Sequence, residues 1–147
     1  THCNIPELVN EIKHALVNVI EEKKAEIIIE NLPGRITANP TTLTLLLQNL
    51  ISNGLKFTGD KNPVIHINCV KKEEEYVFSV QDNGIGIEEA YLDEIFRPFR
   101  RLKREEKSTG IGLAICKKAV QTLGGSISVK SQLGQGSAFS FKLPKSW

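Results

Sequence analysis

Apolar and polar residues follow helical and strand spacing along the first third of the chain. Between Ile5 and Lys24 the apolar positions predict one amphipathic helix, with Asn4 as its candidate cap. The apolar stripe of this helix consists of Leu8, Ile12, Ala15, Leu16 and Val19. The β-branched run Glu26–Glu30 then predicts a short strand, and we expect Arg35–Ala38 to pair beside it.

A second helix is predicted over Thr41–Phe57, directly after the start signal of Asn39 and Pro40. Its core stripe has the spacing i, i+3, i+4, i+7 and i+8 and consists of Leu43, Leu46, Leu47, Leu50 and Ile51. Gly54 falls on the same stripe, where it allows close packing at a cost of about 1 kcal/mol relative to alanine.

Three polar residues, Asn49, Asn53 and Lys56, lie on one flank of this second helix, within about 60° of one another. A carboxamide oxygen is an uncharged metal ligand, and a neighbouring ammonium group can neutralise phosphate. The same residues could instead form an ordinary solvated face, which is the commoner reason for a polar helix edge. Spacing alone leaves both explanations open.

The rest of the chain predicts two antiparallel strands, a helix and a closing hairpin. These elements are the strands Val64–Val70 and Tyr76–Gln81, a short helical segment at Glu88–Phe96, a helix from Leu113 to the glycines at 124–125, and the strands Ser126–Ser131 and Ser137–Leu143, which turn at 134–136. Residues 100–109 are basic, polar and without periodicity, so we expect a mobile loop there. Phe96 and Phe99 precede it and could be its hinge or part of the core.

Composition narrows the class of protein without naming a partner. The 147 residues suit one domain with a real core, and 40% hydrophobic and 24% charged residues are ordinary globular values. A net charge of +2 gives no reason to expect nucleic acid or an acidic membrane. The three cysteines are far apart and odd in number, so we expect neither disulfides nor a zinc site, and a reducing, cytoplasmic compartment. Because the chain starts at Thr1 and has no methionine, we interpret residues 1–147 as one domain excised from a longer chain.

Asp82, Asn83, Gly84, Ile85 and Gly86 follow the strand that ends at Gln81 and place one carboxylate beside two glycines. Taken alone, Asp-Asn-Gly is a strong hairpin signal. Glycines also let a ligand approach the main chain closely, which a Cβ would prevent. A further glycine pair at 110 and 112 opens a predicted helix, and free N–H groups at a helix start attract phosphate.

Four segments, in this order and spacing, resemble the four sequence boxes of sensor histidine kinases. Asn49–Thr58 resembles the N box, Asp82–Gly86 the first glycine box, Phe96–Phe99 the F box and Gly110–Ile115 the second glycine box. Each is weak alone, but four in order make a chance match very unlikely. The chain is similar to catalytic and ATP-binding domains of the gyrase, chaperone and MutL ATPase superfamily, and its 101–116 region to phytochrome-like kinases.

The resemblance implies a role for each residue of the boxes. Asp82 would accept a hydrogen bond from the adenine amino group, and Ser137 would support it through water. Asn53 would bind the Mg²⁺ that bridges the phosphates, with Asn49 beside it, while Lys56 would face the phosphates and Phe57 the nucleotide. Arg101, Gly110, Gly112 and the Leu113 amide would hold the β- and γ-phosphates. The remaining implied nucleotide contacts are Gly84, Gly86, Ile87, Phe96, Phe99, Thr109 and Ile111.

Asn49 discriminates between chemistries. In the ATPases of this superfamily a glutamate that activates water stands four residues before the metal-binding asparagine, and an amide cannot act as that base. The chain also departs from the family at Gly54, where alanine is common, and at Ser108, where a further glycine is frequent. Neither change removes a ligand.

The resemblance implies an α+β fold of the Bergerat type: a two-layer α/β sandwich with a mixed, mostly antiparallel sheet of about five strands and three helices on one face. The activity implied is transfer of the γ-phosphoryl group of Mg-ATP to a histidine on the helical dimerisation domain of the parent kinase, with a response regulator receiver domain as the next partner. We expect the isolated chain to be a monomer with no direct membrane contact. The alternatives are a serine kinase or ATPase of the same superfamily, or an inactive nucleotide-binding regulatory module.

Overall fold

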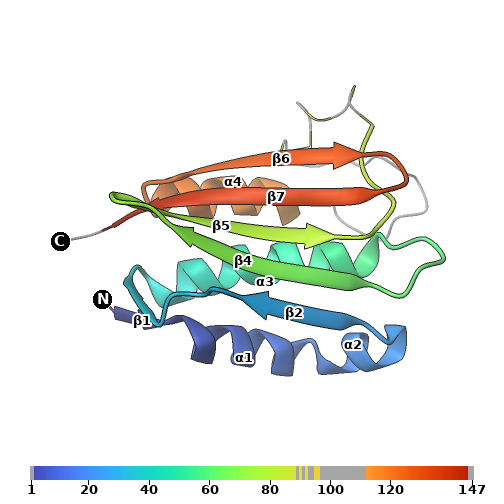
Figure 1. The fold of residues 1–147 in the computed structure, drawn as a ribbon, viewed down its shortest axis with the longest axis horizontal. Helices are drawn as coiled ribbons and strands as arrows, with labels where there is room; N and C mark the ends of the chain where they lie inside the picture. The colour runs from blue at the N-terminus through green and yellow to red at the C-terminus, as the bar shows by residue number, and fades with distance from the viewer. Residues whose placement is uncertain (1, 89, 91, 93–94, 97–111, 146–147) are drawn as a thin grey trace.

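The computed structural model describes residues 2–88, 90, 92, 95–96 and 112–145, which form a two-layer α+β sandwich (Figure 1). One layer is a five-stranded sheet in the order β2 (Glu26–Glu30), β4 (Val64–Lys71), β5 (Glu75–Asp82), β7 (Gly136–Pro144) and β6 (Ser126–Gln132). β2 and β4 are parallel and the other neighbours are antiparallel. The predicted mixed, mostly antiparallel sheet is confirmed.

The second layer consists of helices on one face of the sheet (Figure 1). They are α1 (Ile5–Ala15), α2 (Val17–Lys23), α3 (Pro40–Lys56) and α4 (Gly112–Thr122). Asn4 and Asn39 cap α1 and α3, each accepting a hydrogen bond from a backbone N–H three residues later. The single helix predicted over Ile5–Lys24 is wrong, because the helix is interrupted at Leu16, whose ψ of 10° is not helical. The described part of the chain therefore has four helices in place of the three that were predicted.

A second, two-stranded sheet pairs β1 (His2–Asn4) with β3 (Arg35–Thr37). The expectation that Arg35–Ala38 pairs beside Glu26–Glu30 is therefore wrong. The backbone N–H of Ile5 donates to the Gly34 carbonyl at 3.0 Å, so the turn that follows β2 contacts the start of α1. Cys3 and Ile36 face each other in register and are both buried, which gives this small sheet its apolar side.

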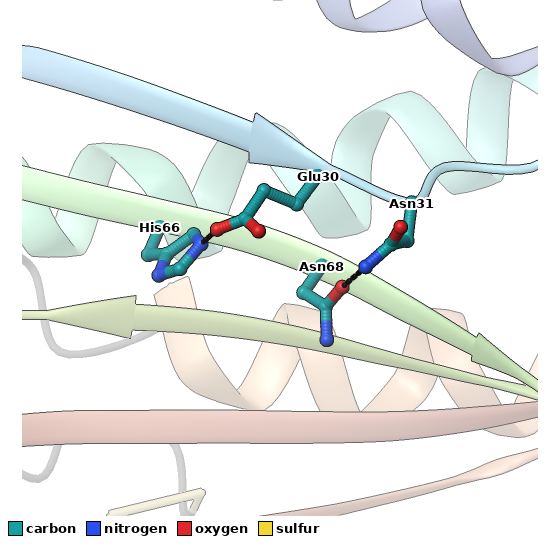
Figure 2. Close-up of polar contacts among 4 residues, drawn as sticks. All are labelled: Glu30, Asn31, His66 and Asn68. Carbon is teal, nitrogen blue, oxygen red and sulfur yellow. Dashed lines mark hydrogen bonds and ion pairs between the residues drawn. The ribbon is translucent and has the colours of Figure 1, made fainter.

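The core lies between α3, α4 and the inner face of the sheet. The predicted α3 stripe is buried throughout, together with Gly54 and Leu55. Phe78 and Phe141 stack across β5 and β7 with ring centroids 5.0 Å apart. Strand alternation places polar side chains on the outer face, where Figure 2 shows His66 of β4 against Glu30 of β2, and Asn31 Nδ2 donates to Asn68 Oδ1 at 3.2 Å.

The end of α3, the end of β5 and the β6–β7 turn meet at one end of the sandwich, and β1 and the end of β7 lie at the opposite end (Figure 1). This juxtaposition brings together segments that are distant in sequence, 53–64, 82–87 and 131–137. In the described part of the chain, no helix combines the length and apolarity that crossing a membrane requires.

Candidate active site

Asp82 is the last residue of β5 and the centre of the site. Its Oδ1 accepts two backbone hydrogen bonds, from Gly84 N–H at 2.9 Å and from Ser137 N–H at 3.2 Å. Burial raises the pKa of this carboxyl above its ordinary value, and the two hydrogen bonds oppose that rise only in part. Neither of these bonds uses the second oxygen, Oδ2, which can therefore accept from a donor on a ligand.

The glycines beside Asp82 are contacted by the protein's own backbone. A Cβ on Gly84 would overlap the carbonyl oxygen of Phe57, the residue that ends α3, and a Cβ on Gly86 would overlap the carbonyl of Gln132. Gly86 also has φ of +75°, in the left-handed region. The main chain is closely approached at both glycines, as predicted. The atoms that would overlap a Cβ belong to the chain's own backbone.

Two backbone hydrogen bonds connect the segments 53–64, 82–87 and 131–137, which together form the frame of the site. Ile85 N–H donates to the Phe57 carbonyl at 2.9 Å, and Gly134 N–H donates to the Ile85 carbonyl at 2.7 Å. The segment around Ile85 is thus held between α3 on one side and the β6–β7 turn on the other. A simple hairpin turn, the reading favoured by Asp-Asn-Gly alone, is wrong, since β5 is followed by this crossing segment and not by a paired strand.

Asn83 forms two hydrogen bonds to the loop that follows α3. No role was predicted for this residue from the sequence. Its Oδ1 accepts from Val64 N–H at 2.8 Å, and its Nδ2 donates to the Asn62 carbonyl at 3.0 Å. Lys61 Nζ donates to the Gly134 carbonyl at 3.1 Å from the same loop. The asparagine could have been suspected from its place between Asp82 and Gly84, but its partners are far away in sequence.

The polar flank of α3 belongs to the same helix end that packs against Asp82. Asn49 and Asn53 are half-buried and Lys56 is exposed, as a flank of the core stripe requires. Asn49 Nδ2 donates to the Leu45 carbonyl at 2.8 Å, which leaves its Oδ1 free to accept. A Cβ on Gly54 would lie 3.2 Å from the Asp82 Cβ, so Asn53 directly precedes a residue that packs against Asp82. The structure therefore brings the N box and the first glycine box together.

Ser137 supports Asp82 through its backbone amide. The support through water that the resemblance implied stays a prediction. Its hydroxyl lies 2.8 Å from the Ser131 hydroxyl, and Ser131 Oγ also accepts from Ile87 N–H at 2.7 Å. Ser131 was not singled out by the sequence, because a serine before a Gly-x-Gly turn is ordinary turn chemistry.

The other predicted site residues divide into two groups. Phe96 is half-buried and packs edge-on against Phe139 at 6.2 Å, which supports the core reading, and Gly112 and Leu113 form the first residues of α4. The predictions that lie outside the described residues are Phe99, Arg101, Thr109, Gly110, Ile111 and the loop 100–109. The helix predicted over Glu88–Phe96 falls partly there too, and Leu92, Ile95 and Phe96 lie in turns.

Metal-binding side chains of the acidic kind do not gather in the described residues. No group of three or more His, Cys, Asp or Glu side chains is placed there to hold an ion. The neutral carboxamides of Asn49 and Asn53 are compatible with a divalent cation that brings its own anionic partner.

Comparison with known proteins agrees with this geometry. Residues 38–146 match the family model described as histidine kinase-, DNA gyrase B-, and HSP90-like ATPase. The chain is 43% identical over 146 residues to the phytochrome-like protein Cph1 of Synechocystis sp., covering 98% of this chain and 19% of that protein. It is 46% identical over 127 residues to cyanobacterial phytochrome A of Nostoc sp., covering 85% and 16%. The chain thus spans about a fifth of the length of these relatives.

Two solved structures have the same fold. The nucleotide-free catalytic domain of histidine kinase ThkA gives a TM-score of 0.85 at 30% identity, covering 99% of this chain and 95% of that one. Full-length ShkA in complex with AMPPNP gives a TM-score of 0.85 at 27% identity, covering 99% and 31%. Fold and site together define a catalytic domain of the histidine kinase class. The chain belongs to the family of histidine kinase-, DNA gyrase B- and HSP90-like ATPases, and the predicted similarity to phytochrome-like kinases is confirmed.

Proposed function

We propose that this chain binds Mg-ATP and transfers its γ-phosphoryl group to a histidine on a separate helical domain, as one domain of a two-component signalling kinase. The observation that carries the proposal is the half-satisfied carboxylate of Asp82: Oδ1 accepts two backbone amides, and burial opposes its charge. An acceptor in such a half-buried position can be completed by an N–H donor on a ligand, and the exocyclic amino group of adenine is such a donor.

The phosphate end of the nucleotide is assigned to the flank of α3. Asn53 would contribute a carboxamide oxygen to Mg²⁺, with Asn49 beside it, and Lys56 would place its ammonium group toward the phosphates. Mg²⁺, when bound, would neutralise charge between the phosphate groups. Arg101, Gly110 and Gly112, with the Leu113 amide, would hold the β- and γ-phosphates, and Thr109 and Ile111 would contact the nucleotide beside them.

Asn49 favours transfer to an acceptor over hydrolysis. Its Nδ2 is engaged by the Leu45 carbonyl, and a neutral amide cannot remove a proton from water. The γ-phosphoryl group would then leave only for a nucleophile that is supplied by another domain. This argues against the ATPase alternative within the same family.

We infer the partners from the relatives. Histidine kinase ThkA, which resembles this chain with a TM-score of 0.81 at 28% identity, was solved in complex with response regulator protein TrrA. We propose a receiver domain as the final phosphoryl acceptor here, a histidine-bearing dimerisation domain as the first, and a cytoplasmic location for the chain.

The test is a trans-phosphorylation assay. The chain is mixed with the histidine-bearing helical domain of its parent kinase and γ-labelled Mg-ATP, with Asn53→Ala as the inactive variant and exposed Lys117→Met as the matched control. We expect acid-labile, base-stable label on the helical domain, lost with Asn53→Ala and kept with Lys117→Met. Release of label as free phosphate, or acid-stable label on a hydroxyl, would replace this proposal with the hydrolase or serine kinase alternative.

A further inference from the structure

We propose that Ser131 is a positioning residue for recognition of the nucleotide base. Its hydroxyl is hydrogen-bonded to the peptide group between Gly136 and Ser137, and the N–H of that peptide group donates to Asp82. This inference rests on the proposed function. Ser131 lies in β6 and pairs in register with Ser137 of β7, so the two side chains emerge on the same face of the hairpin.

The Ser131 hydroxyl uses its full hydrogen-bonding capacity. Its oxygen accepts from Ile87 N–H at 2.7 Å, and its hydrogen is donated to the Gly136 carbonyl at 2.9 Å. The Ser137 hydroxyl at 2.8 Å then donates to the second lone pair of the same oxygen. Three partners from two segments therefore fix one small side chain.

The Gly136 carbonyl and the Ser137 N–H belong to one peptide group. Because that group is planar, holding its oxygen also fixes the direction of its N–H, which points to Asp82 Oδ1 at 3.2 Å. Hydrogen bonds arranged in a chain through a peptide group strengthen one another. Ser131 thereby acts on Asp82 without touching it.

The Gly136 end of this peptide group lies against the residue that the group supports. Gly136 has φ of +108°, and a Cβ there would overlap the backbone carbonyl of Asp82. The backbone of β7 thus runs directly against β5 where Asp82 ends the strand. Loss of the Ser131 hydroxyl would let the peptide tilt, and Asp82 Oδ2 would lose its fixed direction toward the base.

The experiment separates base recognition from folding. Binding of ADP and of inosine diphosphate, whose base has an oxo group in place of the amino group, is measured calorimetrically for the whole 147-residue chain. The variants are Ser131→Ala, Ser131→Thr, which keeps the hydroxyl, and Ser131→Cys, which keeps the shape with a weak hydrogen-bonding group. Ser128→Ala, at an exposed serine of the same strand, is the control.

We expect the preference for ADP over inosine diphosphate to fall about tenfold in Ser131→Ala, equivalent to about 1.4 kcal/mol. Ser131→Cys should fall between, and Ser131→Thr and Ser128→Ala should keep the wild-type ratio. A general loss of folded protein would weaken both ligands equally and leave that ratio unchanged. An unchanged ratio in Ser131→Ala, or in Ser131→Cys if the alanine variant does not fold, would overturn the inference. A wild-type chain that binds neither nucleotide would instead contradict the proposed function, and this inference with it.

Discussion

Gly54 of α3 and Asp82 of β5 lie against each other, so that a Cβ at Gly54 would come within 3.2 Å of the Asp82 Cβ. The same Cβ would overlap Cδ1 of Ile65, the far end of a flexible side chain. Ile65 of β4 is fully buried, and it occupies the space that an alanine at position 54 would need. Glycine in place of the family's common alanine at position 54 therefore goes together with the side chain of Ile65, which fills the space of the missing Cβ.

Gly54→Ala is expected to lower the free energy of unfolding by about 1–2 kcal/mol, because overpacking outweighs the better helix propensity of alanine. In the double variant with Ile65→Val, which removes the overlapping Cδ1, the two changes should compensate by at least about 1 kcal/mol relative to their sum. Urea unfolding of the four proteins measures this coupling. Additive effects would show that Ile65 does not fill the space at Gly54.

Asp82 should make the free chain less stable at neutral pH than its amide variant. Burial raises the folded-state pKa, so the unfolded state loses the proton more readily, and ionised Asp82 opposes folding above the folded pKa. Asp82→Asn keeps an acceptor for both amides and should be more stable than wild type at pH 7. The difference should shrink as the pH falls through the folded pKa toward 3.8, the ordinary value. Chemical unfolding from pH 7 to pH 4 tests the sign, and a wild type more stable at pH 7 would contradict it.

Lys23 at the end of α2 holds the end of α3. Its Nζ donates to the Leu55 carbonyl at 2.6 Å. This carbonyl lies in the last turn of the helix, where acceptors have no partner within the helix and a cation interacts favourably with the helix dipole. Lys23→Met should lower the free energy of unfolding by about 1–2 kcal/mol, and exposed Lys117→Met by less than about 0.5 kcal/mol. Equal effects in urea unfolding would mean that the bond to Leu55 contributes nothing.

Asn83 should be sensitive to which half of its amide is lost. Asn83→Asp keeps the acceptor for Val64 N–H but sets a carboxylate oxygen against the Asn62 carbonyl, so both atoms would be acceptors. We expect a loss of about 2 kcal/mol at pH 7 that diminishes below about pH 4, where a protonated carboxyl can donate. Asn83→Ala should lose stability without that pH dependence, and parallel pH profiles for the two variants would rule out the proposed contact.

Gly86 and Gly134 allow steric overlap to be separated from backbone strain. Both have positive φ, at +75° and +84°, but a Cβ at Gly86 would overlap the chain, whereas none of the described residues lies within 4 Å of one at Gly134. Gly134→Ala should cost about 1 kcal/mol, the left-handed penalty alone, and Gly86→Ala at least about 2 kcal/mol more. Thermal unfolding of both variants decides it, and equal losses would place no close contact at Gly86.

Local pattern predicted the elements of this fold well and their breaks poorly. The α3 stripe and the strand pairs of the sheet followed from spacing, because each is a regular run whose apolar face the core requires. The break at Leu16 has no glycine or proline to signal it, and the apolar spacing continues through it into Val19. Ala15, counted in the predicted stripe, is exposed.

Contacts between distant segments were beyond the sequence. The three residues of β1 carry no strand signal of their own, and their partner strand, Arg35–Thr37, lies about thirty positions away in the sequence. Asp82 was singled out through the resemblance of its segment to a glycine box, whereas Ser131, Asn83 and Lys23 act through hydrogen bonds to segments that only folding brings near. Such residues have no spacing rule by which to be found.

The frame of the site is joined by main-chain atoms, with Ile85 N–H on the Phe57 carbonyl and Gly134 N–H on the Ile85 carbonyl. Every residue except proline supplies these atoms, so the side chains of Phe57, Ile85 and Gly134 are not what makes these two bonds. That gives the architecture a wide mutational tolerance, in keeping with a TM-score of 0.85 at only 30% identity to the ThkA domain. Sequence change at the rim of such a scaffold could alter nucleotide affinity or the docking of the phosphoryl acceptor while the scaffold itself stays the same.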